Sequence, residues 1–294
     1  MKILLIGKDG QVGFALHKKL SSLGEVIATG RETLDLLNIK VVAQFIDQLR
    51  PDIIINAAAY NAVDKAESEP ILAHQINVLA PKVLAEKATE LNIPLIHFST
   101  DYVFDGLKKE AYLESDLIQP LSVYGKSKAE GEVAVMQHSK HIILRTSWIF
   151  GARRHNFLKT VLHLLCIHDH LSMVNDQWGN PTSVCTIADA TFKIVDTLFN
   201  DVSFKNYGTY HVTNEGETNW HDYAIFITHE AKRLGFPIRT NSNFIKSIST
   251  LDYPTPASRP LNSRLNTDKL KKTFMLELPH WQDEVKDVLK VLSN

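Results

Sequence analysis

The chain has 294 residues, a formal net charge of −1 and a hydrophobic fraction of 44%. This length fits one large or two modest domains with a sizeable core, and the near-neutral charge without a basic tract argues against nucleic-acid or membrane partners. Only two cysteines, no C-x-x-C spacing and no leading apolar segment favour a cytoplasmic protein without a disulfide framework.

The first predicted element is a short buried strand, Lys2–Gly7, and a glycine-rich turn follows it directly. The turn, Gly7–Gly13, reads G-x-x-G-x-x-G and opens an amphipathic helix near 11–23. Strand, glycine turn and helix in this order form the context that a dinucleotide-binding fingerprint requires. The glycines let the backbone approach a pyrophosphate, and the helix N-terminus offers free N–H groups and a positive dipole end.

Apolar runs and helical patterns then alternate along the chain to about residue 150. The further predicted elements are strands at Glu25–Thr29, Asp52–Ala58, Ile93–Thr100 and His141–Trp148, and helices near 40–50, 70–91 and 122–138. Alternation at this spacing predicts βαβ units and hence an α/β fold with a doubly wound parallel sheet of the Rossmann type. In such sheets ligands bind beyond the carboxyl ends of the strands.

Beyond residue 150 the pattern loosens, and we expect a smaller α/β substrate lobe over 151–294 after a dinucleotide-binding domain over 1–150. Parts of 171–214 are expected to return to the first domain. The elements predicted in this region are helices near 155–166, 187–199 and 220–234 and a strand near 209–213. The proline-rich stretch Tyr253–Pro260 excludes regular helix.

A tyrosine and a lysine are the strongest candidates for chemistry. Tyr124 and Lys128 lie four residues apart in a predicted helix, about 24 residues after the triplet Ser99-Thr100-Asp101 that ends an apolar run. Positions i and i+4 share one helix face, so the ammonium can lie close to the phenol and to a cofactor. A nearby cation favours phenolate and brings the tyrosine closer to use near neutral pH. The pair alone is a weak signal, and the dinucleotide-binding context gives it weight.

Seven segments carry a resemblance that runs nearly from end to end. They are GKDGQVG, PDIIINAAAYNAVDKAESEP, FSTDYVFDG, PLSVYGKSKAEGE, RTSWIFG, NDQWGNPT and YPTPASRPLNSRLNT. With these segments the chain resembles the dTDP-4-dehydrorhamnose reductase family of the extended short-chain dehydrogenases/reductases. The resemblance implies that NADPH reduces the C4 keto group of dTDP-4-dehydro-L-rhamnose, in the last step of dTDP-L-rhamnose biosynthesis.

The resemblance also implies roles for single residues. Tyr124 would donate the proton, Lys128 would lower the pKa of Tyr124 and hold the nicotinamide ribose, and Thr100 would hydrogen-bond the carbonyl oxygen. Asp101 and Trp148 would contact the sugar. The other expected substrate ligands are Asn156, Asn180, Thr182 and Arg259, of which the arginine is the favoured phosphate ligand. The expected cofactor ligands, besides Lys128, are Gly7, Gly10, Gln11, Val12, Gly13, Arg31, Asp35, Leu36, Ala58, Ala59 and Tyr60.

The chain departs from the family pattern at two places. Family members described as magnesium-bridged dimers carry glutamates where this chain has Ala15 and Cys185, so we expect no metal site and leave a metal-free homodimer open. Many relatives end the second strand with an acid, whereas this chain has Gly30-Arg31, which favours NADPH and still allows NADH. The group Cys166–His170 is expected to be a helix end rather than a metal site.

Two alternatives stay open at this point. One is another enzyme of the superfamily, a nucleotide-sugar epimerase or dehydratase, although a dehydratase would want a second acid after Asp101, where Tyr102 stands. The other is a non-catalytic, NADP-binding regulatory subunit similar to that of methionine adenosyltransferase. The retained Thr100, Tyr124 and Lys128 favour catalysis over the second alternative.

Overall fold

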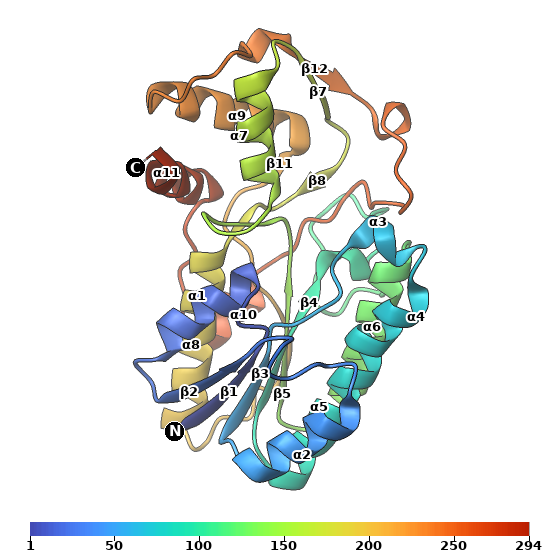
Figure 1. Cartoon of the computed structure of the whole chain (residues 1–294), viewed down its shortest axis with the longest axis vertical. Helices are drawn as coiled ribbons and strands as arrows, with labels where there is room; N and C mark the ends of the chain where they lie inside the picture. The colour runs from blue at the N-terminus through green and yellow to red at the C-terminus, as the bar shows by residue number, and fades with distance from the viewer. Residues whose placement is uncertain (294) are drawn as a thin grey trace.

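A computed structural model describes residues 1–293 as two lobes with a cleft between them (Figure 1). The lower lobe holds a six-stranded sheet in the order β10-β5-β4-β3-β1-β2, in which every neighbouring pair is parallel. Its strands are β1 (Lys2–Ile6), β2 (Glu25–Thr29), β3 (Ile53–Asn56), β4 (Leu95–Thr100), β5 (His141–Thr146) and β10 (Gly208–His211). The strand order reverses between β1 and β3, which is where doubly wound sheets bind ligands. The predicted fold class is confirmed.

Helices cover both faces of this sheet, and the strand sequences explain why. Successive residues of a strand point to opposite faces, so Ile3 and Leu5 enter one core while Leu4 and Ile6 enter the other. Burying each of these side chains contributes about 1.5–3 kcal/mol. The first core is covered by α1 (Gln11–Leu20) and α8 (Val184–Asn200), and the second by α2 (Ile39–Leu49), α5 (Ala80–Leu91) and α6 (Val123–Met136).

The predicted helix over 70–91 is interrupted. The chain forms, in order, α4 (Pro70–His74), the π-helical turn η1 (Gln75–Leu79) and α5. Pro81 lacks the N–H that would continue the regular hydrogen-bond ladder to Asn77, which accounts for the wide turn. The Asn77 side chain accepts a hydrogen bond from Tyr60 N (2.9 Å) and donates one to Tyr60 O (3.0 Å), so the turn fixes the loop after β3.

The upper lobe is built from helices and very short strand pairs. Its buried core gathers large side chains, among them Phe150, Tyr223 and Trp281. The helices are α7 (Phe157–Ile167), α9 (Trp220–Arg233) and α11 (Trp281–Ser293). The strand pairs are β6 (Ile149–Phe150) with β9 (Thr182–Ser183), β7 (Leu171–Val174) with β12 (Ile245–Ile248), and β8 (Trp178–Gly179) with β11 (Thr218–Asn219).

The chain returns twice to the lower lobe after residue 150. Helix α8 packs against α1, and β10 forms the edge of the large sheet beside β5. A second return, α10 (Asp268–Phe274), adds Leu270 and Phe274 to the same core and was not predicted. How the chain divides into folding units stays a prediction. The remaining short elements are α3 (Val63–Ala66), η2 (Asp101–Val103), η3 (Ser242–Phe244) and η4 (Thr250–Asp252).

Among residues 1–293, no helix combines the length and the apolar character that crossing a lipid bilayer requires.

Candidate active site

The glycine-rich turn after β1 has the shape of a phosphate cradle. Gly7 has a φ of +95°, and a Cβ there would lie 2.7 Å from Ala58 N on the neighbouring strand end. A Cβ on Gly13 would collide with the Gly7 carbonyl. Helix α1 begins at Gln11, and no acidic side chain lies in its first turn. The N–H groups and the positive end of the helix dipole are therefore left for an anion.

A cavity of about 290 Å³ lies beside this turn, at the carboxyl ends of β1, β2 and β3. Two of its lining residues, Gly30 and the exposed Arg31, directly follow β2. The predicted cofactor ligands that line it are Gly7, Arg31, Asp35, Leu36, Ala58, Ala59 and Tyr60. The cavity therefore brings together residues from three separate loops, at the carboxyl ends of parallel strands where the sequence predicted a ligand.

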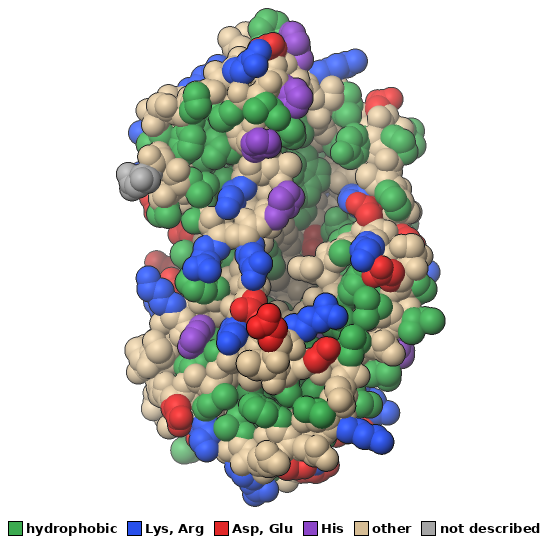
Figure 2. All heavy atoms as spheres, in the orientation of Figure 1, with side chains coloured by type: hydrophobic (Ala, Val, Ile, Leu, Met, Phe, Trp, Pro, Cys, Tyr) green, Lys and Arg blue, Asp and Glu red, His purple; other side chains and the backbone are tan. Residues whose placement is uncertain are grey.

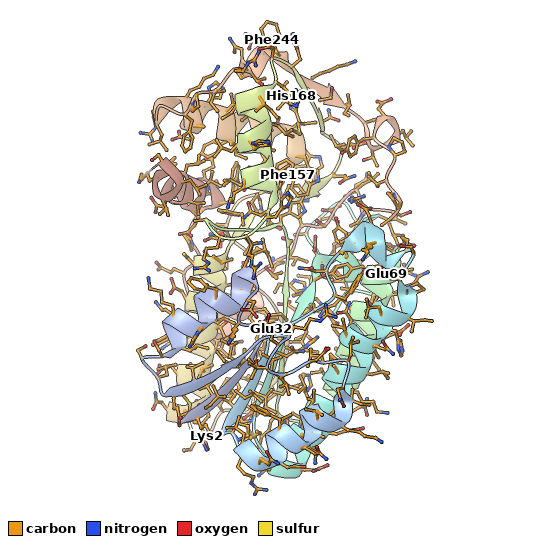
Figure 3. The ribbon with its side chains drawn as sticks, in the orientation of Figure 1. Lys2, Glu32, Glu69, Phe157, His168 and Phe244 are labelled. Atoms are coloured by element: carbon orange, nitrogen blue, oxygen red, sulfur yellow. The ribbon has the colours of Figure 1, made fainter. Side chains whose placement is uncertain are left out.

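A larger cavity, of about 640 Å³, lies in the cleft between the lobes. Ala59 and Asn61 line both cavities, so the two are adjacent. Figure 2 shows the cleft as a hollow with Lys and Arg side chains around its mouth, and Figure 3 shows Phe157 above it and Glu32 below it. Besides Ala59, the predicted residues lining the larger cavity are Gly10, Gln11, Val12, Thr100, Asp101, Tyr124, Lys128, Trp148 and Asn156.

Thr100, Tyr124 and Lys128 meet at this cavity. Thr100 is the last residue of β4, and α6 carries Tyr124 and Lys128 on one face because they are four residues apart. The Thr100 hydroxyl donates to Asp101 Oδ1 (2.9 Å) and accepts from Tyr102 N (3.2 Å), and Thr100 and Tyr124 both line the cavity. The three predicted catalytic side chains are thus held together by the sheet and by one helix.

Burial dominates the protonation of the two acids of this group. It raises the pKa of Tyr124 to about 12, with the Asp101 carboxylate adding to the shift and the Thr100 hydroxyl opposing it. The sequence predicted a lowered pKa, so for the ligand-free protein the direction was wrong. Burial also raises the pKa of Asp101 to about 7, against the Ser263 and Thr100 hydroxyls. At neutral pH the Tyr124 phenol therefore carries its proton.

Lys128 is 1% exposed and lies in a row of polar groups. Its Nζ donates to Phe98 O (2.7 Å) and is 3.2 Å from His97 Nε2. Burial lowers the pKa of Lys128 to about 8, and the Glu132 carboxylate opposes this shift. Glu132 is itself buried in an ion pair with Arg145 (2.7 Å), which also stacks on the Phe104 ring. The lysine is therefore a group that can change charge close to neutral pH.

Trp148 forms part of an aromatic wall above the cavity. Its ring stacks on Trp220 with centroids 3.4 Å apart and planes 9° from parallel, and Phe157 also packs against Trp220 (4.3 Å). Trp148 has a φ of +45°, a left-handed conformation that is uncommon for a bulky side chain. The wall is rigid and flat, which suits a sugar or a base.

Asn156 joins the upper lobe to the glycine-rich turn. Its Oδ1 caps α7 by accepting from Lys159 N (3.1 Å), and its Nδ2 donates to Gln11 Oε1 (2.8 Å) and Gly151 O (2.8 Å). Arg154 also joins the upper lobe to the glycine-rich turn, because its Nε donates to Asp9 O (2.8 Å). Asn156 lines the cavity, but its amide already has partners within the protein.

Asn180 and Thr182 lie outside both cavities, within the joints of the upper lobe. Asn180 Oδ1 accepts from Leu265 N (2.9 Å), and its Nδ2 donates to Gly216 O (2.7 Å). Thr182 is fully buried and donates to Asn180 O (3.1 Å). These contacts make both residues structural, and their expected role as substrate ligands stays a prediction that no contact here supports.

Arg259 lines neither cavity and joins the proline-rich stretch to the lower lobe. It pairs with Asp64 of α3 (2.8 Å), while Ala257 N donates to Asp64 Oδ1 (3.2 Å). Asp64 and the Tyr102 phenol raise the pKa of Arg259, although its burial acts as the largest influence in the opposite direction. The guanidinium is therefore paired with a carboxylate, and its expected role as the phosphate ligand stays a prediction.

The positions considered for metals carry either no ligand atom or side chains that contact other groups. Ala15 and Cys185 line one groove between α1, α8 and α11, and burial raises the pKa of the Cys185 thiol. Asp169 pairs with Arg239 (3.1 Å), and the His170 ring packs against Phe244 (4.8 Å). Within residues 1–293, no three His, Cys, Asp or Glu side chains gather as a metal site would require.

Several residues of the cavity were missed by sequence reasoning. Trp220, Arg154 and His155 line it from the upper lobe, and His97 touches Lys128 from below. Trp220 follows an Asn cap at the start of a predicted helix, a position where an aromatic side chain could have been noticed. The other three carry no signal in the sequence because the contacts join segments far apart in the chain.

Fold and site together define a dinucleotide-binding protein of the short-chain dehydrogenase/reductase class. Its marks are the phosphate cradle at the reversal of strand order and the Thr100, Tyr124 and Lys128 side chains at the adjoining cavity. The model of the RmlD substrate binding domain family matches residues 1–294, and the chain belongs to this family.

Known proteins agree with this membership. A dTDP-4-dehydrorhamnose reductase of Escherichia coli (strain K12) is 44% identical over 299 residues, which cover 99% of this chain and 98% of the relative. A crystal structure of a dTDP-4-dehydrorhamnose reductase from Clostridium acetobutylicum has a TM-score of 0.90 and 36% identity and covers 100% of both chains. Another, from Bacillus anthracis in complex with NADP, has a TM-score of 0.88 and 32% identity over 99% of both chains.

Proposed function

We propose that this chain reduces the C4 keto group of dTDP-4-dehydro-L-rhamnose with NADPH and so makes dTDP-L-rhamnose. The observation that carries the proposal is the meeting of Thr100, Tyr124 and Lys128 at a cavity that adjoins the phosphate cradle. Full-length similarity to reductases of this specificity supports it. The substrate class is a dTDP-linked sugar.

The cofactor fits the residues present. The bare cradle of Gly7, Gly10 and Gly13 leaves room for a pyrophosphate, and the smaller cavity offers Asp35, Leu36 and Ala58 to an adenosine. When bound, NADPH supplies the hydride. Arg31 at the rim favours a 2′-phosphate, because a guanidinium matches phosphate oxygens, and NADH remains a weaker substitute.

The chain's own residues supply the proton and hold the sugar. The Tyr124 hydroxyl gives its proton to the carbonyl oxygen, and the Thr100 hydroxyl turns its single proton from Asp101 to the same oxygen as negative charge develops there. Lys128, on the same face of α6 as Tyr124, holds the nicotinamide ribose. Asp101 accepts a sugar hydroxyl, and its Oδ2 has no hydrogen-bond partner among residues 1–293. Trp148 and Trp220 wall the sugar.

Activity should need no divalent metal, and any homodimer should form without a bridging ion. Ala15 offers no ligand atom, and the Cys185 sulfur suits zinc better than magnesium. Turnover and the mass in solution are therefore expected to survive EDTA. Inactivation by EDTA with specific rescue by magnesium contradicts this part. A cytoplasmic location also stays a prediction.

The decisive experiment follows NADPH oxidation by the purified protein with dTDP-4-keto-L-rhamnose made in situ. We expect one NADPH consumed per dTDP-L-rhamnose formed, with Tyr124→Phe as the inactive control. Conversion of the 4-keto sugar to a different product at the same oxidation level, without net NADPH oxidation, would indicate an epimerase or dehydratase. NADPH binding without any turnover of this or related 4-keto sugars would indicate a regulatory subunit.

A further inference from the structure

A row of three buried polar side chains lies beneath the active-site cavity, and the proposed chemistry uses only the last of them. Asn56 ends β3, His97 lies in β4 and Lys128 in α6, and they are 0%, 1% and 1% exposed. Asn56 Nδ2 is 3.1 Å from His97 Nδ1, and His97 Nε2 is 3.2 Å from Lys128 Nζ. Polar groups buried to this degree must satisfy one another.

Hydrogen-bond accounting allows this row two arrangements. Burial and the Lys128 charge lower the pKa of His97 well below its ordinary value, so the imidazole is neutral and has one donor and one acceptor nitrogen. A charged Lys128 only donates, so Nε2 must accept, the proton must sit on Nδ1, and Asn56 must turn its oxygen to the ring. Only a neutral Lys128 has a lone pair that can accept from Nε2–H, and Nδ1 then accepts from the Asn56 amide.

The orientation of the Asn56 amide matches the second arrangement. Ala58 N donates to Asn56 Oδ1 (3.2 Å), so the Asn56 nitrogen is the atom that faces His97. Lys128 Nζ keeps a second acceptor in Phe98 O (2.7 Å). Ala58 lines the smaller cavity, so the row runs from the proposed cofactor site to the active-site lysine.

We propose that His97 is a positioning residue that acts through Lys128, and that the lysine can carry its charge only while His97 holds its proton on Nδ1. The imidazole thus changes tautomer, not charge, when the lysine gains or loses a proton. The inference deepens the proposed function, because it rests on Lys128 as the residue that holds the cofactor ribose.

The charged groups around Lys128 set its pKa in a pH range that experiments can cover. Glu132, on the same helix and paired with Arg145 of β5, favours the charged lysine, whereas burial opposes it and leaves the pKa of Lys128 at about 8. Tyr124 lies one turn earlier on α6 and stays protonated in this range, and Asp101 faces Tyr124 rather than the lysine. His97 is the remaining titratable neighbour and stays neutral.

The first test is the tautomer of His97, read by nitrogen NMR on wild-type protein labelled with ¹⁵N-histidine. His97→Gln identifies the signal. Between about pH 6 and about pH 10 we expect the proton to move from Nδ1 to Nε2 while the ring stays uncharged. A single tautomer across this range, or a ring that protonates instead, overturns the proposal. His138 is the internal control, because Ile93 O can only accept from its Nε2 (2.8 Å) and so fixes one tautomer above its own pKa.

The second test separates positioning from packing through the pH profile of kcat/KM. His97→Leu removes the acceptor of the charged lysine, and charge-assisted hydrogen bonds are about twice as strong as neutral ones. The substitution therefore destabilises charged Lys128 more than neutral Lys128. The basic limb of the kcat/KM profile should move to lower pH by roughly one unit. His97→Gln, whose amide can offer either atom, should keep the limb in place.

His138→Gln controls for the loss of a buried histidine elsewhere, since His138 is 2% exposed and bonds to Thr89 and Ile93 rather than to the row. The positioning role of His97 is contradicted if the basic limb does not move in a folded His97→Leu protein. It is also contradicted if the limb moves equally in His97→Gln. If His97→Leu does not fold, the proposal is tested by the His97 tautomer in the wild-type protein and by the pH profile of His97→Gln. If the protein lacks reductase activity altogether, only the proposed function fails, and the tautomer measurement still tests the row.

Discussion

The two lobes hold their shapes by different kinds of hydrogen bond. The lower lobe rests on the backbone ladders of a six-stranded sheet. The upper lobe has only two-stranded pairs within the described residues, and side-chain amides join them to distant backbone groups. Asn214 Oδ1 accepts from Ser183 N (2.7 Å), and Asn262 Nδ2 donates to Lys108 O (2.6 Å) and Glu110 O (2.8 Å).

This difference separates chemistry from shape. A backbone ladder survives most side-chain changes, so reactive residues at its edge can be altered without loss of the fold. A buried amide that serves two backbone groups cannot be removed without leaving both unsatisfied, which costs about 1–3 kcal/mol for each group. We therefore expect substitutions in the lower-lobe site to change rates and those in the upper-lobe joints to change stability.

The largest expected effect tests the lower lobe. Tyr124→Phe removes the proton donor and should lower kcat by about 10²- to 10⁴-fold, while the melting temperature and NADPH affinity stay nearly unchanged. Steady-state rates, a fluorescence titration with NADPH and a thermal melt measure the three quantities. A variant that keeps more than half of the wild-type kcat would remove Tyr124 from its assigned role.

A second change in the same lobe should raise stability. Asp101 has a pKa of about 7 when folded against 3.8 for the ordinary group, so the native state keeps a proton that the unfolded state gives up between these values. Wild-type stability should therefore fall as pH rises through this window and stay low above it. The Asn side chain of Asp101→Asn cannot ionise, so this variant keeps the stability that the wild type loses. Its free energy of unfolding should exceed that of the wild type by about 2–4 kcal/mol at pH 8, with no difference near pH 4.

Asp105→Asn is the matched control for this measurement. The Leu107 N–H, followed by the Tyr112 hydroxyl, lowers the pKa of Asp105, so its carboxylate contributes stability that is present at neutral pH and lost as pH falls. The control should therefore change stability at pH 8 in the opposite direction. Chemical denaturation of the three proteins at several pH values gives the comparison, and equal behaviour of both variants contradicts the assignment for Asp101.

The third change tests the joints of the upper lobe. Asn180→Ala leaves Leu265 N and Gly216 O without their partners and should lower the free energy of unfolding by at least about 2 kcal/mol. Asn200→Ala, at the exposed end of α8, should stay within about 0.5 kcal/mol of wild type. Urea unfolding measures both. A loss in Asn180→Ala no greater than in the control would break the contrast between the lobes.

The smallest expected effect returns to the edge of the sheet. Arg31→Ala should reduce the preference for NADPH over NADH by about tenfold, or about 1.4 kcal/mol, without a change in stability. The ratio of kcat/KM values for the two cofactors measures it, and the exposed Lys40→Ala serves as the control for a lost surface charge. A wild-type enzyme that already prefers NADH, with Arg31→Ala neutral, contradicts the role of the arginine.

The contrast between the lobes also accounts for how much the sequence could predict. The lower lobe follows local rules, because alternating residues of short apolar runs fill two cores, and Glu25–Thr29 is found with its predicted bounds. Thr100, Tyr124 and Lys128 could be brought together because a strand end and a helix face constrain them. The break before Pro81 was overlooked in this half.

The upper lobe depends on contacts between distant segments. Arg259 meets Asp64 across 195 positions, and Asn180 meets Leu265 across 85. No local pattern announces such a pair, so polar residues that build joints look like residues that bind ligands. Helix α11 is the exception, since Trp281, Val285 and Leu289 recur at helical spacing and could have been found.

Because the chain returns twice to the lower lobe, that lobe is completed late during synthesis on the ribosome. The edge strand β10 and the covering helices α8 and α10 belong to the first lobe, yet they lie between residues 184 and 274. Domains made early in a chain usually fold while the rest is translated. Here the face of the sheet that α1 covers in part gains α8 only after residue 200 has been made and α10 only after residue 274. Until then the core around Leu5 and Ile55 lacks part of its cover in the nascent chain.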